Sequence, residues 1–194
     1  MTLLEGPTFV VEQQRKLFEM RNQYRIFDES GDQIGAVGQV KQSALAIVAR
    51  FGTDLDVALP VWLEVTDSAG RTVLLMHKPW FRMTFGVSGA DGTLLGSISK
   101  RIKVGKARFT ITDATGAEIG EIRAQNWRAK DFTVTDRAGH EVARATKEWR
   151  GLATEMFTDA DTYVVRLQPY ATEPLRSLAL AASLAIDVVM KQKD

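Results

Sequence analysis

One pattern of apolar and polar residues occurs five times along the chain. Each copy has a stretch in which apolar and polar residues alternate, then usually Asp, two further residues and Gly, and then a second apolar stretch. Alternation at every second residue is typical of a half-buried strand. Asp-x-x-Gly favours a turn, because Asp can bond the backbone two residues on and Gly readily adopts a positive φ. The sequence therefore predicts five strand–turn–strand units, with turns at Gly31, Gly70, Gly92, Gly116 and Gly139.

The spacing of these glycines indicates a meander of hairpins. The last three intervals are 22, 24 and 23 residues, which leaves only short connections. The first interval, 39 residues, leaves room for a further strand at Ala44–Phe51. A repeat near 23 residues would also suit a solenoid, but these copies lack the fixed Leu or Asn positions of solenoid repeats. Closure into a barrel removes the exposed edges of a long meander, so we predict a β-barrel.

The C-terminal part of the chain has a helical pattern. From Leu175 to Met190 nearly every residue is apolar and helix-forming, and the preceding Thr172–Pro174 is a suitable helix start. Sixteen residues span about 24 Å, less than the roughly 30 Å of a hydrocarbon core. We predict a buried core helix over 172–191 and not a membrane span or an interfacial helix. One narrow polar stripe is expected to face a barrel opening or a buried polar partner, and it contains Arg176, Ser183 and Asp187.

Composition narrows the class of protein further. The chain has 194 residues, 45% of them hydrophobic, which fits a single domain over 1–194 with a sizeable core. Lys and Arg number 25 against 24 Asp and Glu, so there is no strong nucleic-acid signal. The chain has no Cys, which excludes disulfides and thiolate chemistry. The first residues, with Glu5 among them, do not resemble a signal peptide, so we expect a cytoplasmic protein.

Two stretches carry a family resemblance. KEWRGLATEMFTDADTYVVRLQP (Lys147–Pro169), followed by the apolar helix, is similar to the C-terminal half of phospholipid scramblases. FVVEQQRKLFEMRNQYRIFDESGDQIG resembles the start of scramblases and LURP-one-related proteins. The resemblance extends from Phe9 to Met190 and is most specific at Trp149–Asp161. It implies the Tubby-like fold, a twelve-stranded barrel of hairpins wrapped around a central hydrophobic helix.

The functions of this superfamily diverge. Tubby proteins bind phosphoinositides, scramblases are associated with calcium-dependent lipid movement, and LURP-one-related proteins act in plant defence. A shared fold transfers none of these activities by itself. The resemblance also points to a proposed calcium loop, whose matching residues here are Asp159 and Asp161. An EF-hand-like loop needs a central Gly and a closing Glu, and both are missing, so a turn-and-strand role is the simpler interpretation.

A basic stretch, KRIKVGKARF (Lys100–Phe109), supplies the candidate binding site. Alternation places its apolar residues on the inner face and most of its cations on the outer face or at the tip. Such a patch would suit a lipid headgroup or another phosphate, whereas the alternative is a solvated hairpin whose charges protect an edge. The candidate anion- or lipid-binding residues are Arg101, Lys103, Lys106 and Arg108.

Aromatic residues beside cations form a weaker candidate. In KPWFRMTF (Lys78–Phe85) the aromatics could lie at a membrane interface or stack on a base, but the simpler prediction is a strand with core aromatics. Trp127 with Arg128 and Lys130 has the same two interpretations.

No catalytic residues are predicted. His77 and His140 are isolated and there is no Cys, so a metal cluster is not expected. GVSGA (Gly86–Ala90) lacks the closing Gly of a nucleophile elbow. The leading hypothesis is a non-enzymatic module, without a cofactor, that binds anionic, phosphoinositide-like lipid at the membrane periphery or another anionic partner. The alternatives are a structural or protein-interaction domain and a calcium-dependent scramblase.

Overall fold

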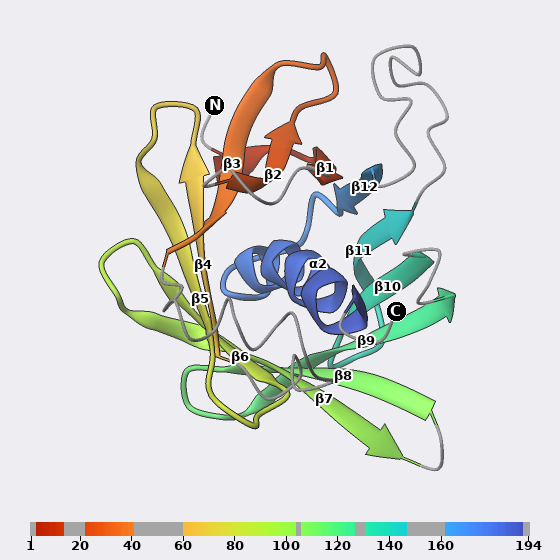
Figure 1. Ribbon diagram of the computed structural model, residues 1–194. Helices are drawn as coiled ribbons and strands as arrows, with labels where there is room; N and C mark the ends of the chain where they lie inside the picture. Colours follow the sequence, from red (N-terminus) through yellow and green to blue (C-terminus); the bar gives the residue numbers. More distant parts are fainter. Residues whose placement is uncertain are drawn as a thin grey trace.

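Twelve antiparallel strands close into a barrel around one C-terminal helix (Figure 1). The computed structural model describes residues 3–13, 22–40, 60–103, 106–126, 131–146 and 162–191. The mainly β fold with its central helix confirms the predicted architecture. Its elements are η1 (Leu3–Glu5), β1 (Thr8–Gln13), β2 (Asn22–Phe27), β3 (Gln33–Gln39), β4 (Val61–Asp67), β5 (Thr72–Lys78), β6 (Thr84–Gly89), β7 (Leu94–Lys103), β8 (Lys106–Asp113), β9 (Glu118–Asn126), β10 (Asp131–Asp136), β11 (Glu141–Thr146), β12 (Thr162–Leu167) and α2 (Leu175–Lys191).

The five predicted turns join ten of these strands into hairpins. All five turn glycines have φ between 76° and 88°, the left-handed region that glycine tolerates best. In the first turn the Asp28 side chain accepts hydrogen bonds from the backbone N–H of Ser30 and Asp32, at 2.9 and 3.0 Å. These bonds account for the Asp-x-x-Gly pattern. The predicted extra strand at Ala44–Phe51 lies outside the described residues.

The first and last strands close the barrel. β1 and β12 run antiparallel, with Phe9 opposite Val165 and Val11 opposite Tyr163. Pairing of strands that lie so far apart in the sequence leaves no free edge along the sheet. The inner face of the sheet and α2 share one apolar core.

Helix α2 occupies the middle of the barrel (Figure 1). No side chain from Leu178 to Ile186 is more than 1% exposed. A helix that is apolar almost all round must be enclosed, and here the sheet encloses it. The enclosed segment includes Ser183, whose hydroxyl donates to the Leu180 carbonyl at 2.7 Å, so this part of the polar stripe is satisfied within the helix.

The start of α2 is fixed by local and distant bonds. The Glu173 carboxylate accepts the backbone N–H of Ser177 at 3.2 Å, within the segment expected to start the helix. The Arg176 side chain reaches η1, where it donates to the carbonyl oxygens of Leu4 at 2.8 Å, Glu5 at 3.1 Å and Gly6 at 2.7 Å. The polar stripe therefore begins with a cation that binds the start of the chain.

Glycines in the wall let the helix approach the sheet. A Cβ at Gly96 would lie 2.1 Å from the Thr112 carbonyl oxygen and 2.9 Å from a methyl carbon of Leu178. A Cβ at Gly120 would lie 2.5 Å from the Thr135 carbonyl oxygen and 3.2 Å from a methyl carbon of Leu175. Both positions therefore need glycine, because there is no space for a Cβ atom.

The barrel has two different ends. We call the end that carries the five glycine turns the turn end; α2 begins there, next to Gly120. The opposite end, which we call the loop end, is where the six odd-numbered strands end and the six even-numbered strands begin. Its strand ends are Gln13, Gln39, Lys78, Lys103, Asn126 and Thr146.

Candidate functional site

The basic residues lie on the hairpin of β7 and β8 at the loop end. The register pairs Arg101 with Arg108 and Lys103 with Lys106. Two residues earlier on β7, Ser99 pairs with Thr110, so all six positions belong to the same face of the sheet. The alternate positions face the core: Ile98 and Ile111, the pair before Ser99 and Thr110, are buried, and so is Phe109 opposite Lys100. The register therefore assigns the positions of Arg101, Lys103 and Arg108 to the outer face, as alternation predicted, and adds Lys106, which was expected at the tip, as the first residue of β8.

Arg108 is the member of this group whose side chain the structure describes. It is exposed, and its guanidinium lies 4.0 Å from the Glu121 carboxylate on β9. Glu121 also forms a shorter ion pair with Arg123. Because one carboxylate faces two arginines, it cannot neutralise both. Exposed ion pairs of this kind contribute little to stability, so Arg108 can exchange its partner for another anion at small cost.

Charge is strongly segregated in this part of the chain. From Ser68 to Thr112 there are eight Lys or Arg residues and a single acidic residue, Asp91. Asp91 lies in the turn between β6 and β7, at the turn end, where its side chain accepts from the backbone N–H of Thr93. The chain as a whole is almost neutral. A local excess of cations, rather than the net charge, therefore distinguishes this segment of the chain.

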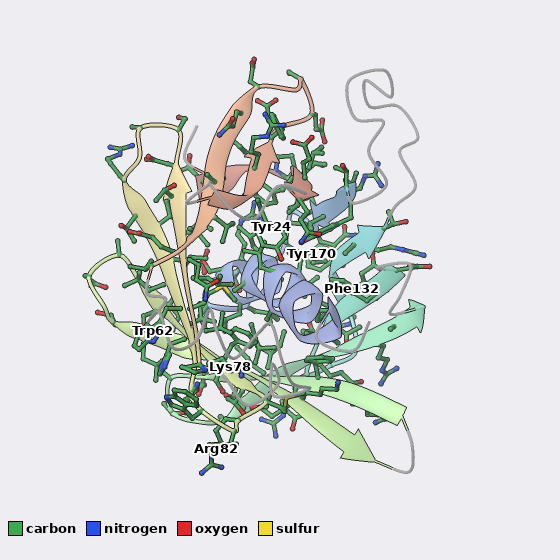
Figure 2. All side chains as sticks on the ribbon, in the orientation of Figure 1. Tyr24, Trp62, Lys78, Arg82, Phe132 and Tyr170 are labelled. Atoms are coloured by element: carbon green, nitrogen blue, oxygen red, sulfur yellow. The ribbon has the colours of Figure 1, made fainter. Side chains whose placement is uncertain are left out.

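The aromatic stretch departs from its prediction. We expected Lys78–Phe85 to be a strand with core aromatics, but β5 ends at Lys78 and β6 starts at Thr84. Only Phe85 enters the core, whereas Trp80 is 55% and Phe81 77% exposed. The strand stops because Pro79 has no N–H to donate and Phe81 has a φ of 55°, which is incompatible with an extended strand. Figure 2 shows Arg82 projecting outward from this connection.

Lys78 is not part of the cationic surface. Its side chain is fully buried, and it pairs in register with the buried Val61. Burial disfavours the charged form and lowers the pKa of Lys78. A headgroup outside the barrel cannot reach this amine, so the surface cation beside the aromatic residues is Arg82.

A stacked pair lies on the outer face next to this connection. The rings of Trp62 on β4 and His77 on β5 are 3.6 Å apart between centroids and 17° from parallel. Desolvation against the indole lowers the pKa of His77, and the nearby charge of Lys78 lowers it further. His77 is therefore held toward its neutral form at the edge of the basic surface.

The two histidines do not form a site together. His77 is near the loop end, while His140 belongs to the last turn and lies 3.1 Å from Asp136 through its Nδ1. Gly86–Ala90 forms the end of β6 and the following turn, without the strand-to-helix geometry of a nucleophile elbow. The described part of the chain holds no group of three or more His, Cys, Asp or Glu arranged as metal ligands.

A hollow on the surface carries charges of both signs. It lies at the turn end, between the turn regions of the β8–β9 and β10–β11 hairpins, and its lining includes Glu118, Arg123, Asp136 and Arg137. The mixture gives no net preference for an anion, unlike the β7–β8 hairpin.

Several predicted residues fall outside the described ranges. Asp159 and Asp161, the calcium candidates, are among them, as are Trp127, Arg128 and Lys130. The side chain of Asp187, the last member of the helix stripe, is likewise not described. Their roles stay predictions from the sequence.

The fold and the sequence together define the class of protein. The barrel around a buried helix is the Tubby-like fold, and the model of the Scramblase family matches residues 2–192. The chain belongs to the Scramblase family. A solved protein of Arabidopsis thaliana has the same fold, with a TM-score of 0.56 at 14% identity, over 97% of this chain and 94% of that one.

Two curated fungal proteins are similar in sequence. The Saccharomyces cerevisiae protein called altered inheritance rate of mitochondria protein 25 is 26% identical over 92% of this chain and 66% of its own length. A phospholipid scramblase family protein of Schizosaccharomyces pombe is 24% identical over 84% of this chain and 47% of its own. The chain thus spans only part of each relative. Within the described residues, no helix combines the length and hydrophobicity needed to cross a bilayer.

Sequence reasoning missed the exposed aromatic connection. Trp80 and Phe81 fit an alternating apolar pattern as well as core residues do. The available signal was Pro79, because proline breaks strand pairing and often marks the start of a connection.

Proposed function

We propose that this protein is a binding module, not an enzyme, that attaches peripherally to membranes containing anionic phospholipid. The observation that carries the proposal is the outer face of the β7–β8 hairpin, where Arg101 pairs with Arg108 and Lys103 with Lys106. The family is lipid-related and its barrel generally non-catalytic, and both properties support this choice.

The cross-strand pairs give the physical reason. Like charges directly opposite each other destabilise a sheet, so two such pairs in succession carry a cost in the free protein. An anion bound between them removes that repulsion. Each cation near an anionic membrane contributes about 1 kcal/mol of attraction, so four contribute about 4 kcal/mol, or close to a thousandfold in affinity.

The headgroup that fits best is one with several phosphates, such as a phosphoinositide. The four cations form two cross-strand pairs that are neighbours on the outer face, so together they can face more than one phosphate. A cytoplasmic location at the membrane periphery agrees with this proposal, because the cytoplasmic leaflet carries the anionic lipids.

Co-sedimentation with vesicles tests the site. Wild-type protein is mixed with vesicles of phosphatidylcholine alone, or with phosphatidylserine or a phosphoinositide added, and compared with an Arg101→Gln/Lys103→Gln/Arg108→Gln variant. We expect the variant to lose about 100-fold in affinity for acidic vesicles, since three attractions are removed. Equal pelleting of both proteins would show that the hairpin is not the site.

A matched variant controls for net charge. Arg71, Arg137 and Arg144 lie away from the hairpin: Arg71 and Arg137 are in turns, and Arg144 is on β11 beside Asp131. Their replacement by Gln changes the net charge equally and is expected to leave vesicle binding nearly intact. A loss as large as that of the hairpin variant would mean that binding depends on overall charge alone.

The same assay separates the alternatives. A structural or protein-interaction domain predicts no salt-dependent binding to any vesicle. Calcium-dependent lipid scrambling is an alternative because the chain belongs to the Scramblase family. It requires that calcium change vesicle binding or the melting temperature of the protein. Asp159→Asn/Asp161→Asn is the variant that would remove a calcium effect if these residues are the ligands.

A further inference from the structure

The loop end carries a group of three exposed aromatic side chains. Trp80 and Phe81 are adjacent in the β5–β6 connection, and Trp62 is 39% exposed close by on β4. Val40 is also exposed, and its N–H bonds the Trp62 carbonyl oxygen at 3.1 Å, so it belongs to the same area. A cluster of large apolar side chains on the surface marks an interaction site rather than chance exposure.

The backbone of this connection is held in an unfavourable conformation. The φ of 55° at Phe81 lies in the left-handed region, which a bulky aromatic residue rarely adopts. Asn or Gly would take this conformation more readily. Phe81 therefore occupies a backbone conformation that suits it poorly, and its ring gains no burial in the core. This combination indicates a functional role for the ring.

The connection is attached to the basic hairpin. The backbone N–H of Lys100 donates to the Met83 carbonyl oxygen at 2.8 Å, and the Thr84 and Ser99 hydroxyls are bonded at 3.0 Å. The aromatic residues and the cations of β7 are therefore parts of one surface at the loop end. Figure 2 shows Trp62 and Arg82 at the lower left of the barrel, and the hairpin of β7 and β8, labelled in Figure 1, extends to the lower right.

The charges around the aromatic residues match an acidic bilayer. No acidic residue occurs between Thr72 and Ala90, so the connection itself brings no carboxylate toward anionic lipid. Arg82 follows Phe81 directly, where its cation can stay at the headgroup level while the rings go deeper. Trp and Phe beside basic residues are the composition of interfacial membrane anchors.

We infer that Trp80 and Phe81 insert into the interface of an anionic bilayer, with the hairpin cations on the phosphates beside them. This inference rests on the proposed lipid-binding function and assigns the partner as a bilayer, not a soluble phosphate. It also sets the orientation of the barrel, with the loop end toward the membrane and the five glycine turns away from it.

Quenching by brominated lipid tests the insertion. Tryptophan fluorescence is recorded on acidic vesicles with and without phosphatidylcholine brominated on its acyl chains, for the wild type and for Trp80→Phe. We expect quenching in the wild type and loss of most of it in Trp80→Phe, which keeps an aromatic ring and should bind vesicles almost as well. Equal quenching in both proteins, or none in vesicle-bound wild type, would overturn the inference.

Binding variants separate this inference from the proposed function. Trp80→Ala/Phe81→Ala is expected to lose about 10- to 100-fold in vesicle affinity, including at high salt where the hairpin contributes little. Leu94→Ala is the control, since Leu94 is 47% exposed but lies at the turn end; it should bind as the wild type does.

The possible outcomes differ for the two proposals. If the hairpin variant loses binding and the double alanine variant does not, the hairpin is correct and insertion is wrong. If only the double alanine variant loses binding, insertion is correct and the hairpin is not the site. Binding of soluble inositol phosphate without any vesicle affinity would contradict insertion and leave a headgroup site.

Discussion

The Nε of Arg176 donates a hydrogen bond to the carbonyl oxygen of Leu4 at 2.8 Å, joining the core helix to the start of the chain. Arg176 is the second residue of α2, where the helix dipole disfavours a cation. Its position is explained by three carbonyl oxygens of the N-terminal segment, which accept its N–H groups. The contact closes the turn end of the barrel over the helix.

Replacing Arg176 by Met should therefore destabilise the fold. The substitution keeps much of the apolar length of the side chain and removes all three bonds, so we expect a loss of about 3 kcal/mol in the free energy of unfolding. Urea denaturation measures it. Arg71→Met is the matched control, because Arg71 forms an exposed ion pair with Asp67, and it should cost about 0.5 kcal/mol. Equal losses in the two variants would show that the N-terminal contact is not stabilising.

Gly96→Ala should be far more damaging than Gly86→Ala. The new methyl at Gly96 would overlap the Thr112 backbone and press on Leu178, so we expect a cost of about 3 kcal/mol or a failure to fold. At Gly86 the nearest atom would be 3.9 Å away, and alanine should be neutral or slightly stabilising. Thermal denaturation compares the two. A well-tolerated Gly96→Ala would mean that the helix does not pack closely against β7 and β8.

Phe81→Asn should separate stability from membrane binding. Asn tolerates the left-handed conformation better than Phe, and an exposed ring contributes little to the core. We expect a protein at least as stable as the wild type in urea that nevertheless binds vesicles less tightly. A clear loss of stability would indicate that Phe81 has a packing role instead.

The stability of the protein should fall as the pH drops below 6.5, the ordinary pKa of a histidine such as His77. The folded state lowers the pKa of His77, so between that lowered value and 6.5 the unfolded chain binds more protons. The contribution of His77 is complete above pH 6.5 and is lost progressively below it. Urea unfolding at pH 7.5 and 5.5 should show this slope, and His77→Gln should reduce it. An unchanged slope in His77→Gln would assign the effect to other groups.

Local signals in the sequence predicted the hairpins and the helix. Asp28 and Gly31 identify a turn because both signals are local. The side chain of Asp28 bonds backbone N–H groups no more than four residues away, and Gly31 supplies the positive φ. The outer-face position of Arg108 likewise follows from alternation with Phe109 and Ile111.

Contacts between segments that are distant in the sequence could not be predicted from local patterns. The bond from Arg176 to Leu4 spans 172 residues, and no local pattern marks it. The approach of Glu121 to Arg108 depends on the β8–β9 register. Closure of the barrel was expected because it removes exposed edges, and the strand number came from the family resemblance, but no local signal identified β1 and β12 as the strands that pair.

The exposed aromatic connection shows why an apolar pattern alone is ambiguous. Trp80 and Phe85 are both aromatic and stand five residues apart, yet one is in solvent and the other in the core. Pro79 and the φ of Phe81 decide the difference. They end the strand at this point, although the apolar residues of the sequence continue beyond it.

The most direct test of the account is the binding of wild-type protein to vesicles across salt concentrations. At low salt, we predict firm binding to vesicles containing phosphatidylserine or phosphoinositide and weak binding to phosphatidylcholine alone. Binding to the acidic vesicles should fall steeply as salt is raised, because the hairpin cations are screened beyond about 10 Å at 0.1 M. A protein that remains in the supernatant with acidic vesicles at the lowest salt would contradict the account.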